Sequence, residues 1–218
     1  MTGDVRHKIA KRAADELEAN NVVNLGVGIP VLVVEYLDKG KGIIFQSENG
    51  ILGVGPEPTP EEFDPFIVNA GRRPATVVTG ASYSDSAAAF GLIRGGHLDA
   101  TIIGALQVNE RGDIANWVLP GKDILGMGGA MDLVVGAKKV IVTMQHISPK
   151  GDRKILPECT IPLTAPKAAH VIITECALFR FRGGKMILEE IDPDMTLDEI
   201  KDITPAAYEV SPDLKKMQ

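Results

Sequence analysis

Glu48 is the residue whose type and setting best suit it to chemistry. It follows the segment 43–46, which is predicted to be a strand, and its sequence neighbours are all uncharged: Gln46, Ser47, Asn49 and Gly50. A carboxylate at a strand end, among small polar groups, can act as a nucleophile or as a general base. It can equally be an ordinary acid on a surface loop, and the residues alone leave both interpretations open.

A glycine-rich segment, Gly126–Asp132, is the second feature with chemical potential. It reads Gly-Met-Gly-Gly-Ala-Met-Asp, so Met131 stands where a dinucleotide-binding loop has its third glycine, and the Gly-Lys-Ser/Thr end of a phosphate-binding loop is missing. Three glycines before a helix can present bare main-chain N–H groups to an anion or to a developing oxyanion. A flexible turn of small residues is the alternative.

Several other kinds of chemistry are not expected. The four histidines are scattered, with no pair four residues apart and no carboxylate–histidine pattern, so no metal site is predicted. No Gly-x-Ser-x-Gly motif supplies a hydrolase nucleophile. The two cysteines, Cys159 and Cys176, have neither a metal-binding nor a redox spacing, and we interpret them as small apolar core residues in a reducing cytoplasm.

The composition limits the class of protein further. The chain has 218 residues, of which 44% are hydrophobic, and this suffices for a core without disulfides and for a single domain over residues 1–218. A net charge of −6 and an aromatic content of 5% argue against nucleic-acid binding. No apolar run reaches the ~18–20 residues of a membrane helix and the polar start carries no secretory signal, so a cytoplasmic protein without membrane contact is expected.

Short β-branched apolar runs alternate with helical patterns, which predicts an α/β fold with a mixed, mainly parallel sheet flanked by helices. Single strands are predicted at 22–25, 43–46, 76–79, 100–103, 140–144 and 171–174, and hairpins at 106–116 and 178–188. Helices are predicted at 5–18, at 31–37 after Pro30, at 86–94 with Ser84 or Asp85 as cap, at 131–137, and from a capping box at 196–199 to about 203.

The loops indicate where a site would lie. The prolines of segment 55–62 exclude both helix and sheet, so this part of a loop-rich middle region is expected to be exposed. Ligands of open α/β sheets bind at the carboxyl ends of the strands. Three polar or glycine-rich turns are expected there, at 26–30, at 47–50 and just before Met131.

The sequence resembles the β chain of class I 3-oxoacid CoA-transferases over nearly the whole chain, from about residue 5 to residue 210. The two most specific segments are Ser47–Gly50 and Gly126–Asp132. The segments that carry the resemblance are 24–30, 47–53, 69–71, 85–86, 92–97, 115–117, 120–122, 126–134, 162–164 and 179–181.

The resemblance implies a role for several residues. Glu48 would attack an acyl-CoA and become a glutamyl-CoA thioester in a ping-pong reaction, and the main-chain N–H of Gly129 would stabilise the oxyanion. The residues that would bind CoA or substrate are Gly128, Asn49, Asn24, which matches an active-site asparagine of the family, and Arg72, which stands where some members carry a lysine near the CoA.

The resemblance also implies the fold, the partner and the substrates. The fold would be the CoA-transferase-like α/β fold, and an α subunit of similar size would complete the site in a heterodimer or an α2β2 heterotetramer. Coenzyme A would be a substrate, with no permanently bound cofactor. The donor would be succinyl-, acetyl- or butyryl-CoA, and the acceptor a short carboxylic or 3-oxo acid such as acetoacetate.

Two other functions are compatible with the residues. A sugar-phosphate isomerase of similar fold would use a carboxylate to move protons and glycine loops to bind phosphate, although it would need more cationic side chains than these loops carry. A non-catalytic protein of the same fold, serving only for binding, would have Glu48 as a structural loop acid.

Overall fold

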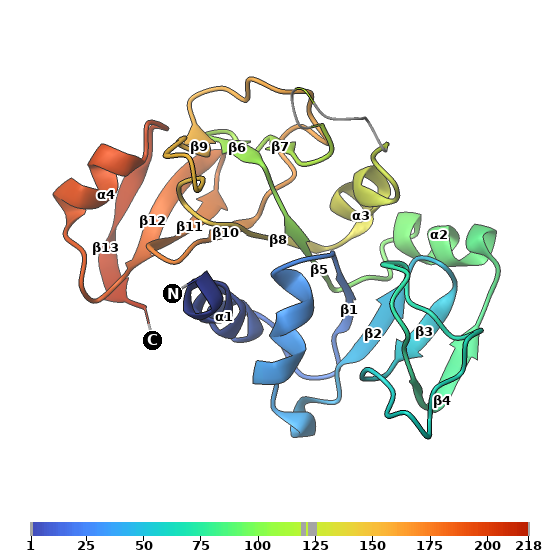
Figure 1. The fold of residues 1–218 in the computed structure, drawn as a ribbon. Coiled ribbons are helices and arrows are strands. Elements are labelled where there is room, and N and C mark those ends of the chain that lie inside the picture. The colour runs from blue at the N-terminus through green and yellow to red at the C-terminus, as the bar shows by residue number, and fades with distance from the viewer. Residues whose placement is uncertain (1, 119–120, 122–125, 218) are drawn as a thin grey trace.

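The computed structural model describes residues 2–118, 121 and 126–217. Pro120 and Lys122, which belong to one of the segments that carry the resemblance, lie outside the described residues. Figure 1 shows the main sheet running through the middle of the molecule, from β13 at one edge to β4 at the other.

The main sheet has ten strands in the order β13-β12-β11-β10-β8-β5-β1-β2-β3-β4. Their bounds are β1 Val22–Leu25, β2 Ile44–Ser47, β3 Ile51–Val54, β4 Val77–Tyr83, β5 Ala100–Gly104, β8 Lys139–Thr143, β10 Val171–Ile173, β11 Ala177–Arg182, β12 Lys185–Ile191 and β13 Glu209–Lys216. The central strands, β10-β8-β5-β1-β2, are parallel, and antiparallel pairs join them on both sides. The predicted α/β class with a mixed, mainly parallel sheet is therefore confirmed.

A second, three-stranded sheet and several helices complete the fold. The small sheet consists of β7 Ile114–Ala115, β6 Gln107–Asn109 and β9 Ile155–Leu156, in that order. The α-helices are α1 Thr2–Ala14, α2 Ser86–Arg94, α3 Ala130–Gly136 and α4 Leu197–Ile203, and the 3₁₀ helices are η1 Pro30–Tyr36 and η2 Lys39–Lys41. Helices α1 and η1 lie against one face of the main sheet, and α2 and α3 lie on the other (Figure 1).

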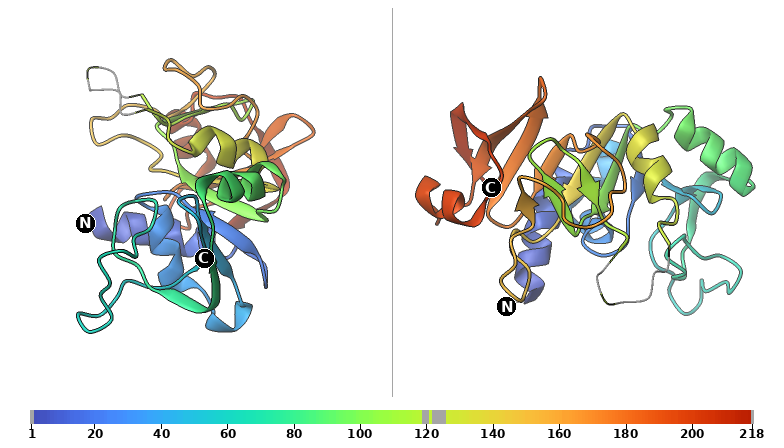
Figure 2. Two further views of the ribbon diagram at one scale, coloured as in Figure 1. Left: turned by 90° about the vertical axis from the view of Figure 1, so that its right-hand side faces the viewer. Right: turned by 90° about the horizontal axis from the view of Figure 1, so that it is seen from above.

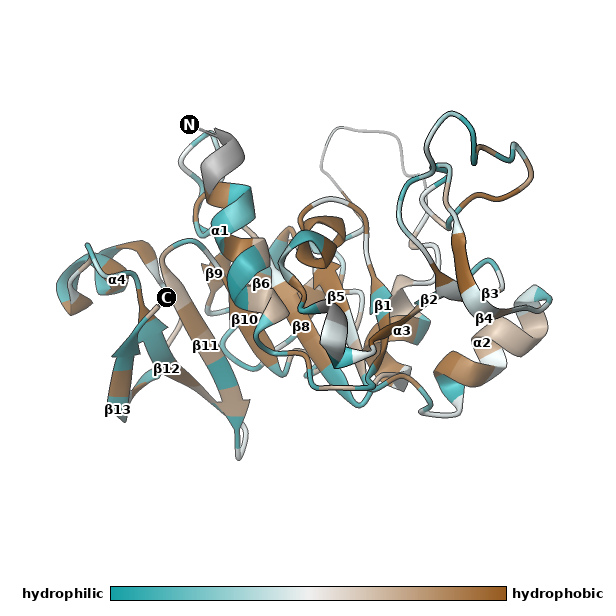
Figure 3. Ribbon diagram, turned by 90° about the horizontal axis from the view of Figure 1, so that it is seen from below, coloured by the Kyte–Doolittle hydropathy of each residue, from teal (hydrophilic) through white to brown (hydrophobic). Residues whose placement is uncertain are grey.

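Two apolar cores lie between the main sheet and the helices, one on each face of the sheet. Because alternate residues of a strand point to opposite faces, the neighbours Ile102 and Ile103 of β5 belong to different cores. Ile9 of α1 packs in one core, whereas Ile93 of α2 and Leu133 of α3 pack in the other. Figure 3 shows hydrophobic residues along β5, β8 and β10. The parallel strands are thus covered on both faces, which explains their nearly continuous apolar sequences.

The helix caps and hairpins predicted from local sequence are confirmed. The Asp85 side chain, rather than that of Ser84, caps α2 by accepting a hydrogen bond from the Ala88 N–H at 2.8 Å. The capping box that opens α4 is complete, with Thr196 and Glu199 each bonding the other's main-chain N–H. Both predicted hairpins form, as β6–β7 and as β11–β12.

Three strands were not predicted: β3, β13 and β9, which is only two residues long and pairs with β6. β3 lies at Ile51–Val54, where only a loop was expected, because the turn at Gly50 sends the chain straight back along β2 and pairs Leu52 with Gln46. β13 is largely exposed and polar, so it carries no apolar alternation, and its pairing with β12 at the sheet edge makes it a strand. β4 also runs further than predicted, to Tyr83.

Two helices differ from prediction. α1 ends at Ala14 rather than at Glu18, and the segment after Pro30 is a 3₁₀ helix. A run of β-branched valines in η1 disfavours the regular α-helix. The predicted loop beyond β3 is confirmed: the Gly55 N–H donates to the Thr76 carbonyl at 2.8 Å, and Figure 2 shows the enclosed segment projecting from the body.

A buried ion cluster accounts for the early end of α1. Glu16 turns inward and pairs with Arg12 at 2.9 Å, Lys139 at 2.8 Å and Arg180 at 3.0 Å. Burial alone would raise the pKa of Glu16, but the hydrogen bonds and charges of Arg180 and Lys139 outweigh it and lower the pKa to about 2. The cluster therefore joins α1 to β8 and β11 through one carboxylate.

We expect Glu16→Gln to lower the free energy of unfolding by about 3–5 kcal/mol at neutral pH, because three cations lose their shared counter-charge. The pKa of Glu16 is depressed on folding, so this contribution is present above the usual carboxyl pKa and is lost as pH falls toward 2. Urea unfolding at pH 7 measures this loss of unfolding free energy, and urea unfolding at pH 3 measures how far it shrinks as Glu16 becomes protonated. The exposed Glu18→Gln is the control, and an equal effect of the two substitutions would contradict the cluster's role.

Candidate active site

The carboxyl ends of the parallel strands bring the predicted turns to one edge of the sheet. β1 leads into Gly26, β2 leads into Glu48, and β5 and β8 end beside them. This is the edge at which ligands of open α/β sheets bind.

Glu48 stands in a tight turn that the sequence Ser-Glu-Asn-Gly makes possible. The Gly50 N–H donates to the Ser47 carbonyl at 3.0 Å, and Gly50 has φ +115°, a conformation that side-chain-bearing residues rarely adopt. The Ser84 N–H donates to the Gly50 carbonyl at 2.8 Å and anchors the turn to the start of α2. The turn therefore holds Glu48 at the point where β2 reverses into β3.

Glu48 and Gly129, which are far apart in the sequence, lie in contact. A Cβ atom built on Gly129 would overlap Oε2 of Glu48 and would lie 3.2 Å from Cζ of Phe90. Gly129 is the N-cap of α3 and has φ −82°, which any residue can adopt. Glycine is thus needed here for space and not for backbone conformation.

The electrostatic surroundings of Glu48 favour its neutral form more than water would. Burial raises the pKa of Glu48, a hydrogen bond from the Gly129 main-chain N–H opposes this, and the negative charge of Asp132 raises the pKa further. Among the described residues, no lysine or arginine forms an ion pair with Glu48. The carboxylate is therefore half-buried and not held by a salt bridge, as its uncharged sequence neighbours suggested.

Asp132 and Phe90 are functional candidates that the sequence did not reveal as such. Asp132, in the first turn of α3, pairs with Arg94 of α2 at 2.6 Å, and the Arg94 guanidinium lies 5.6 Å from the centre of the Phe90 ring. The signal that could have indicated Asp132 is its spacing, since it stands one helical turn after Gly129. Nothing in the sequence shows that α2 packs against α3.

Asn24 of β1 lies opposite Gln46 of the neighbouring strand β2. It is buried, and its Nδ2 donates to the side-chain Oε1 of Gln46 at 2.8 Å and to the Gln46 carbonyl at 3.1 Å. Gln46 belongs to β2 and precedes Glu48 by two residues, whereas Glu48 itself lies in the turn beyond the strand. Asn24 is therefore joined to the strand that ends at Glu48.

The residues on either side of Glu48 hold the long loop between β3 and β4. Ser47 Oγ accepts a hydrogen bond from the Ala70 N–H at 2.9 Å, and Asn49 Nδ2 donates to the Val68 carbonyl at 2.7 Å. Arg72, on the same loop, is exposed and has φ +61°. Asn49 thus holds this loop with its amide, and the loop carries Arg72 close to the turn.

The remaining glycines of the predicted loop are exposed. Gly126 and Gly128 have φ +90° and +55°, and a Cβ atom at either would meet nothing within 4 Å. Their conformations explain the need for glycine at both positions. Of the predicted site residues, the structure therefore brings Glu48 and Gly129 into contact. Hydrogen bonds join Asn24 to the strand that precedes Glu48 and Asn49 to the neighbouring loop, and Gly128 and Arg72 are at the surface.

Metal ligands, membrane-spanning helices and reactive cysteines are the other features that could indicate a function. Within the described residues, no group of three or more histidine, cysteine, aspartate or glutamate side chains could hold a metal ion. None of the described helices is both long and apolar enough to cross a membrane. Cys159 and Cys176 are free, half-buried thiols. Cys176 packs against the core that contains Ile93 and Leu133, as predicted, whereas Cys159 lies outside both cores. Burial raises their pKa values to about 11 and about 12.

Comparisons with known proteins define the class to which this fold and site belong. The family model for coenzyme A transferase matches residues 6–202. The beta subunit of the acetate CoA-transferase of Escherichia coli (strain K12) is 51% identical over 211 residues, which cover 97% of this chain and 96% of that protein. The B subunit of the succinyl-CoA:3-ketoacid coenzyme A transferase of Helicobacter pylori (strain ATCC 700392 / 26695) is 48% identical over 206 residues, which cover 94% and 99%.

The chain therefore belongs to the coenzyme A transferase family, a class of transferases that move CoA between an acyl-CoA and an acid. These relatives are β or B subunits over nearly their full length, so the resemblance to the β chain of 3-oxoacid CoA-transferases is confirmed. The crystal structure of the acyl-CoA transferase (YdiF) apoenzyme from Escherichia coli O157:H7 shares the fold, with a TM-score of 0.78 at 23% identity over 98% of this chain and 43% of that one.

We expect Gly129→Ala to lower the rate of CoA transfer by about 10²–10³, because the added methyl group displaces Glu48 from the Gly129 N–H. Steady-state kinetics of the complex with its partner subunit provide the measurement. Gly91→Ala is the matched control, since a Cβ atom there meets nothing within 4 Å and the residue lies in α2. Equal activity of the two variants would show that the contact does not matter.

The charge of Asp132 should be visible in the pH dependence of the reaction. Asp132 raises the pKa of Glu48, so Asp132→Asn should lower that pKa and move the acidic limb of the kcat/KM profile to lower pH. The exposed Asp202→Asn, on α4, should leave the profile unchanged. A limb that stays in place, or moves to higher pH, would exclude Glu48 as the titrating group.

Proposed function

We propose that this chain is the catalytic β subunit of a CoA-transferase that moves CoA from a short acyl-CoA to a short carboxylic or 3-oxo acid through a glutamyl-CoA thioester on Glu48. The observation that carries the proposal is the contact between the half-buried Glu48 carboxylate and the main-chain N–H of Gly129. Membership of the coenzyme A transferase family supports it.

The reaction begins with attack on the acyl-CoA. A carboxylate oxygen of Glu48 forms a bond to the thioester carbonyl carbon, the C–S bond breaks, and CoA leaves as a thiolate. The thiolate then attacks Cδ of Glu48 in the mixed anhydride and releases the acyl group as a free carboxylate. The acceptor acid reverses both steps on the glutamyl-CoA thioester, so the acyl bond energy is retained and the kinetics are ping-pong.

The Gly129 amide suits one particular oxyanion. Because it already donates to the Glu48 carboxylate, it would remain beside that group after Glu48 has become an acyl group. We infer that it stabilises the negative charge that develops when the thiolate or the acceptor attacks Cδ of Glu48. One such donor is worth about 10²–10³ in rate.

The environment of Glu48 is consistent with a nucleophile. A salt bridge would hold the carboxylate and weaken its attack, and the turn offers none. Partial burial removes water, which would otherwise hydrolyse the anhydride and the thioester. The raised pKa makes the carboxylate more basic, which favours attack on a thioester.

The other predicted residues support this centre in different ways. We propose that Asn24 is a positioning residue that acts through Gln46, and that Asn49 keeps the loop of Arg72 against the site. Arg72 is exposed and cationic, which suits the phosphates of CoA. Gly128, also exposed, leaves room for substrate beside Gly129.

We also propose the setting in which the enzyme works. The whole chain, 1–218, would form a single domain that associates with an α subunit in an αβ or α2β2 complex, as the β and B names of its relatives suggest. CoA would be a substrate, with no permanently bound cofactor. Two free cysteines are consistent with a reducing cytoplasm. The acyl donor and the acceptor acid would be short, as in the names of the acetate and 3-ketoacid enzymes.

The family match speaks against a sugar-phosphate isomerase. A non-catalytic β subunit is the remaining alternative, and it would keep the fold and the CoA affinity without covalent chemistry at Glu48.

Covalent trapping tests the mechanism directly. When the complex is incubated with acyl-CoA and no acceptor, then treated with hydroxylamine or borohydride, peptide mass spectrometry should find the modification on Glu48. Glu48→Gln should remove it and lower transfer at least about 10⁴-fold, since an amide cannot form the thioester. Glu61→Gln, on the exposed loop, is the control. Transfer that survives in Glu48→Gln would establish that another group is the nucleophile.

A further inference from the structure

Phe90 of α2 brings an apolar ring next to the reactive end of Glu48. The ring's Cζ atom lies 3.2 Å from the place that a Cβ atom on Gly129 would occupy, and Oε2 of Glu48 overlaps that same place. The ring edge and the carboxylate oxygen are therefore no more than about 5 Å apart, too close for a water molecule to lie in line between them. One side of the carboxylate is thus bordered by carbon.

Neighbouring contacts hold the ring in this place. Phe90 is half-buried and packs against the core that contains Ile93. The Arg94 guanidinium lies over the ring, 5.6 Å from its centre, and the Arg94 Nε donates to Asp132 of α3 at 2.6 Å. At the other end of α3, a Cβ atom on Gly136 would overlap the Ile93 carbonyl, so the two helices approach closely. A ring between a core, a cation and a second helix has little freedom to leave.

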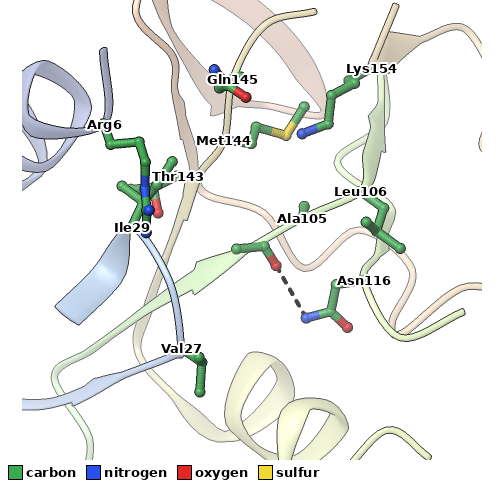
Figure 4. Close-up of a pocket in the computed structure, with 11 residues that line it drawn as sticks. Arg6, Val27, Ile29, Ala105, Leu106, Asn116, Thr143, Met144, Gln145 and Lys154 are labelled. Carbon is green, nitrogen blue, oxygen red and sulfur yellow. Dashed lines mark hydrogen bonds between the residues drawn. The ribbon is translucent and has the colours of Figure 1, made fainter. Parts of the chain in front are cut away.

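Water reaches this edge of the sheet. An open cavity of about 330 Å³ lies at the carboxyl ends of β1, β5 and β8, and Figure 4 shows the polar side chains of Arg6, Asn116 and Lys154 among those that line it. A space of this size with polar walls holds water. Neither Glu48 nor Phe90 lines the cavity, so the protection of Glu48 from water depends on side chains closer to it.

Water competes with the acceptor acid for the glutamyl-CoA thioester. When water attacks Cδ of Glu48, a C–O bond forms, the C–S bond breaks, CoA leaves as a thiolate, and the two protons of water pass to the solvent. Glu48 returns as a carboxylate, but the acyl bond energy is lost. The Gly129 N–H stabilises the oxyanion of either attack, so it does not select the acid over water. Selection requires a group that restricts access.

We propose that Phe90 selects transfer over hydrolysis, because its ring edge keeps water from Cδ of Glu48 while the thioester waits for an acceptor. The ring offers water no strong hydrogen-bond partner, whereas the hydrocarbon part of an acceptor acid can pack against it. This inference rests on the proposed function and names the side chain that protects its intermediate.

The lifetime of the intermediate tests this role. The complex with the partner subunit is loaded with acetyl-CoA or succinyl-CoA, separated from free acyl-CoA by gel filtration, and left without acceptor while a thiol reagent follows the release of CoA. Phe90→Ala and Phe90→Leu should each shorten the lifetime at least about tenfold, since neither side chain reaches Gly129. Phe90→Met, which is apolar and long enough to reach it, should retain most of the lifetime.

A steady-state ratio separates this role from a merely structural one. Loss of folded complex lowers transfer and hydrolysis together, whereas loss of the ring should raise the ratio of hydrolysis to transfer about tenfold. Phe181→Ala is the matched control, since Phe181 lies on β11 beside Gly112 and packs, partly buried, against the same core as Phe90. That substitution should leave the ratio unchanged.

Two results would overturn the proposal. One is a thioester in Phe90→Leu that lives as long as in the unaltered complex, and the other is an equal ratio of hydrolysis to transfer in Phe90→Ala and Phe181→Ala. If Phe90→Ala does not assemble, Phe90→Leu decides the question, because leucine keeps the contact with the core.

The lifetime measurement also separates this proposal from the proposed function. If the unaltered complex shows no modification on Glu48, the proposed function and the role of Phe90 are both wrong. A trapped Glu48 thioester whose lifetime is unchanged in Phe90→Leu would leave the mechanism in place and remove only the role of Phe90.

Discussion

The contact between the Glu48 carboxylate and the main-chain N–H of Gly129 depends on the absence of a side chain at position 129, since a Cβ atom there would occupy the place of Oε2. The rest of the site is arranged around this close approach. The turn closed by Gly50 presents Glu48, and the N-terminal end of α3 presents the amide. Phe90 lies beside Gly129, and Asp132, which pairs with Arg94, acts on the charge of Glu48.

The parallel strands determine where these parts meet. A sheet covered on both faces by apolar cores is rigid, so groups attached to its strand ends keep their relative positions. The polar groups of the site lie at the carboxyl-terminal edge, and the Asn24–Gln46 pair on β1 and β2 is buried.

Much of the architecture could be predicted because its causes are local. The strand at Val22–Leu25, the Asp85 cap and the Thr196 capping box follow from residues within one turn or one strand. β13 could not be predicted, because its polar residues form a strand only by pairing with β12. The length of α1 was misjudged for a similar reason, since Glu16 leaves the helix to meet cations from β8 and β11.

By itself, the sequence determined that Glu48 has uncharged neighbours, that glycines precede α3, and that the chain resembles one family, because motifs and turn residues act at short range. Only the tertiary structure decided that Gly129 touches Glu48 and that the charge of Asp132 acts on Glu48. Each of these pairs joins elements distant in the chain, and packing of the two cores against the sheet brings them together.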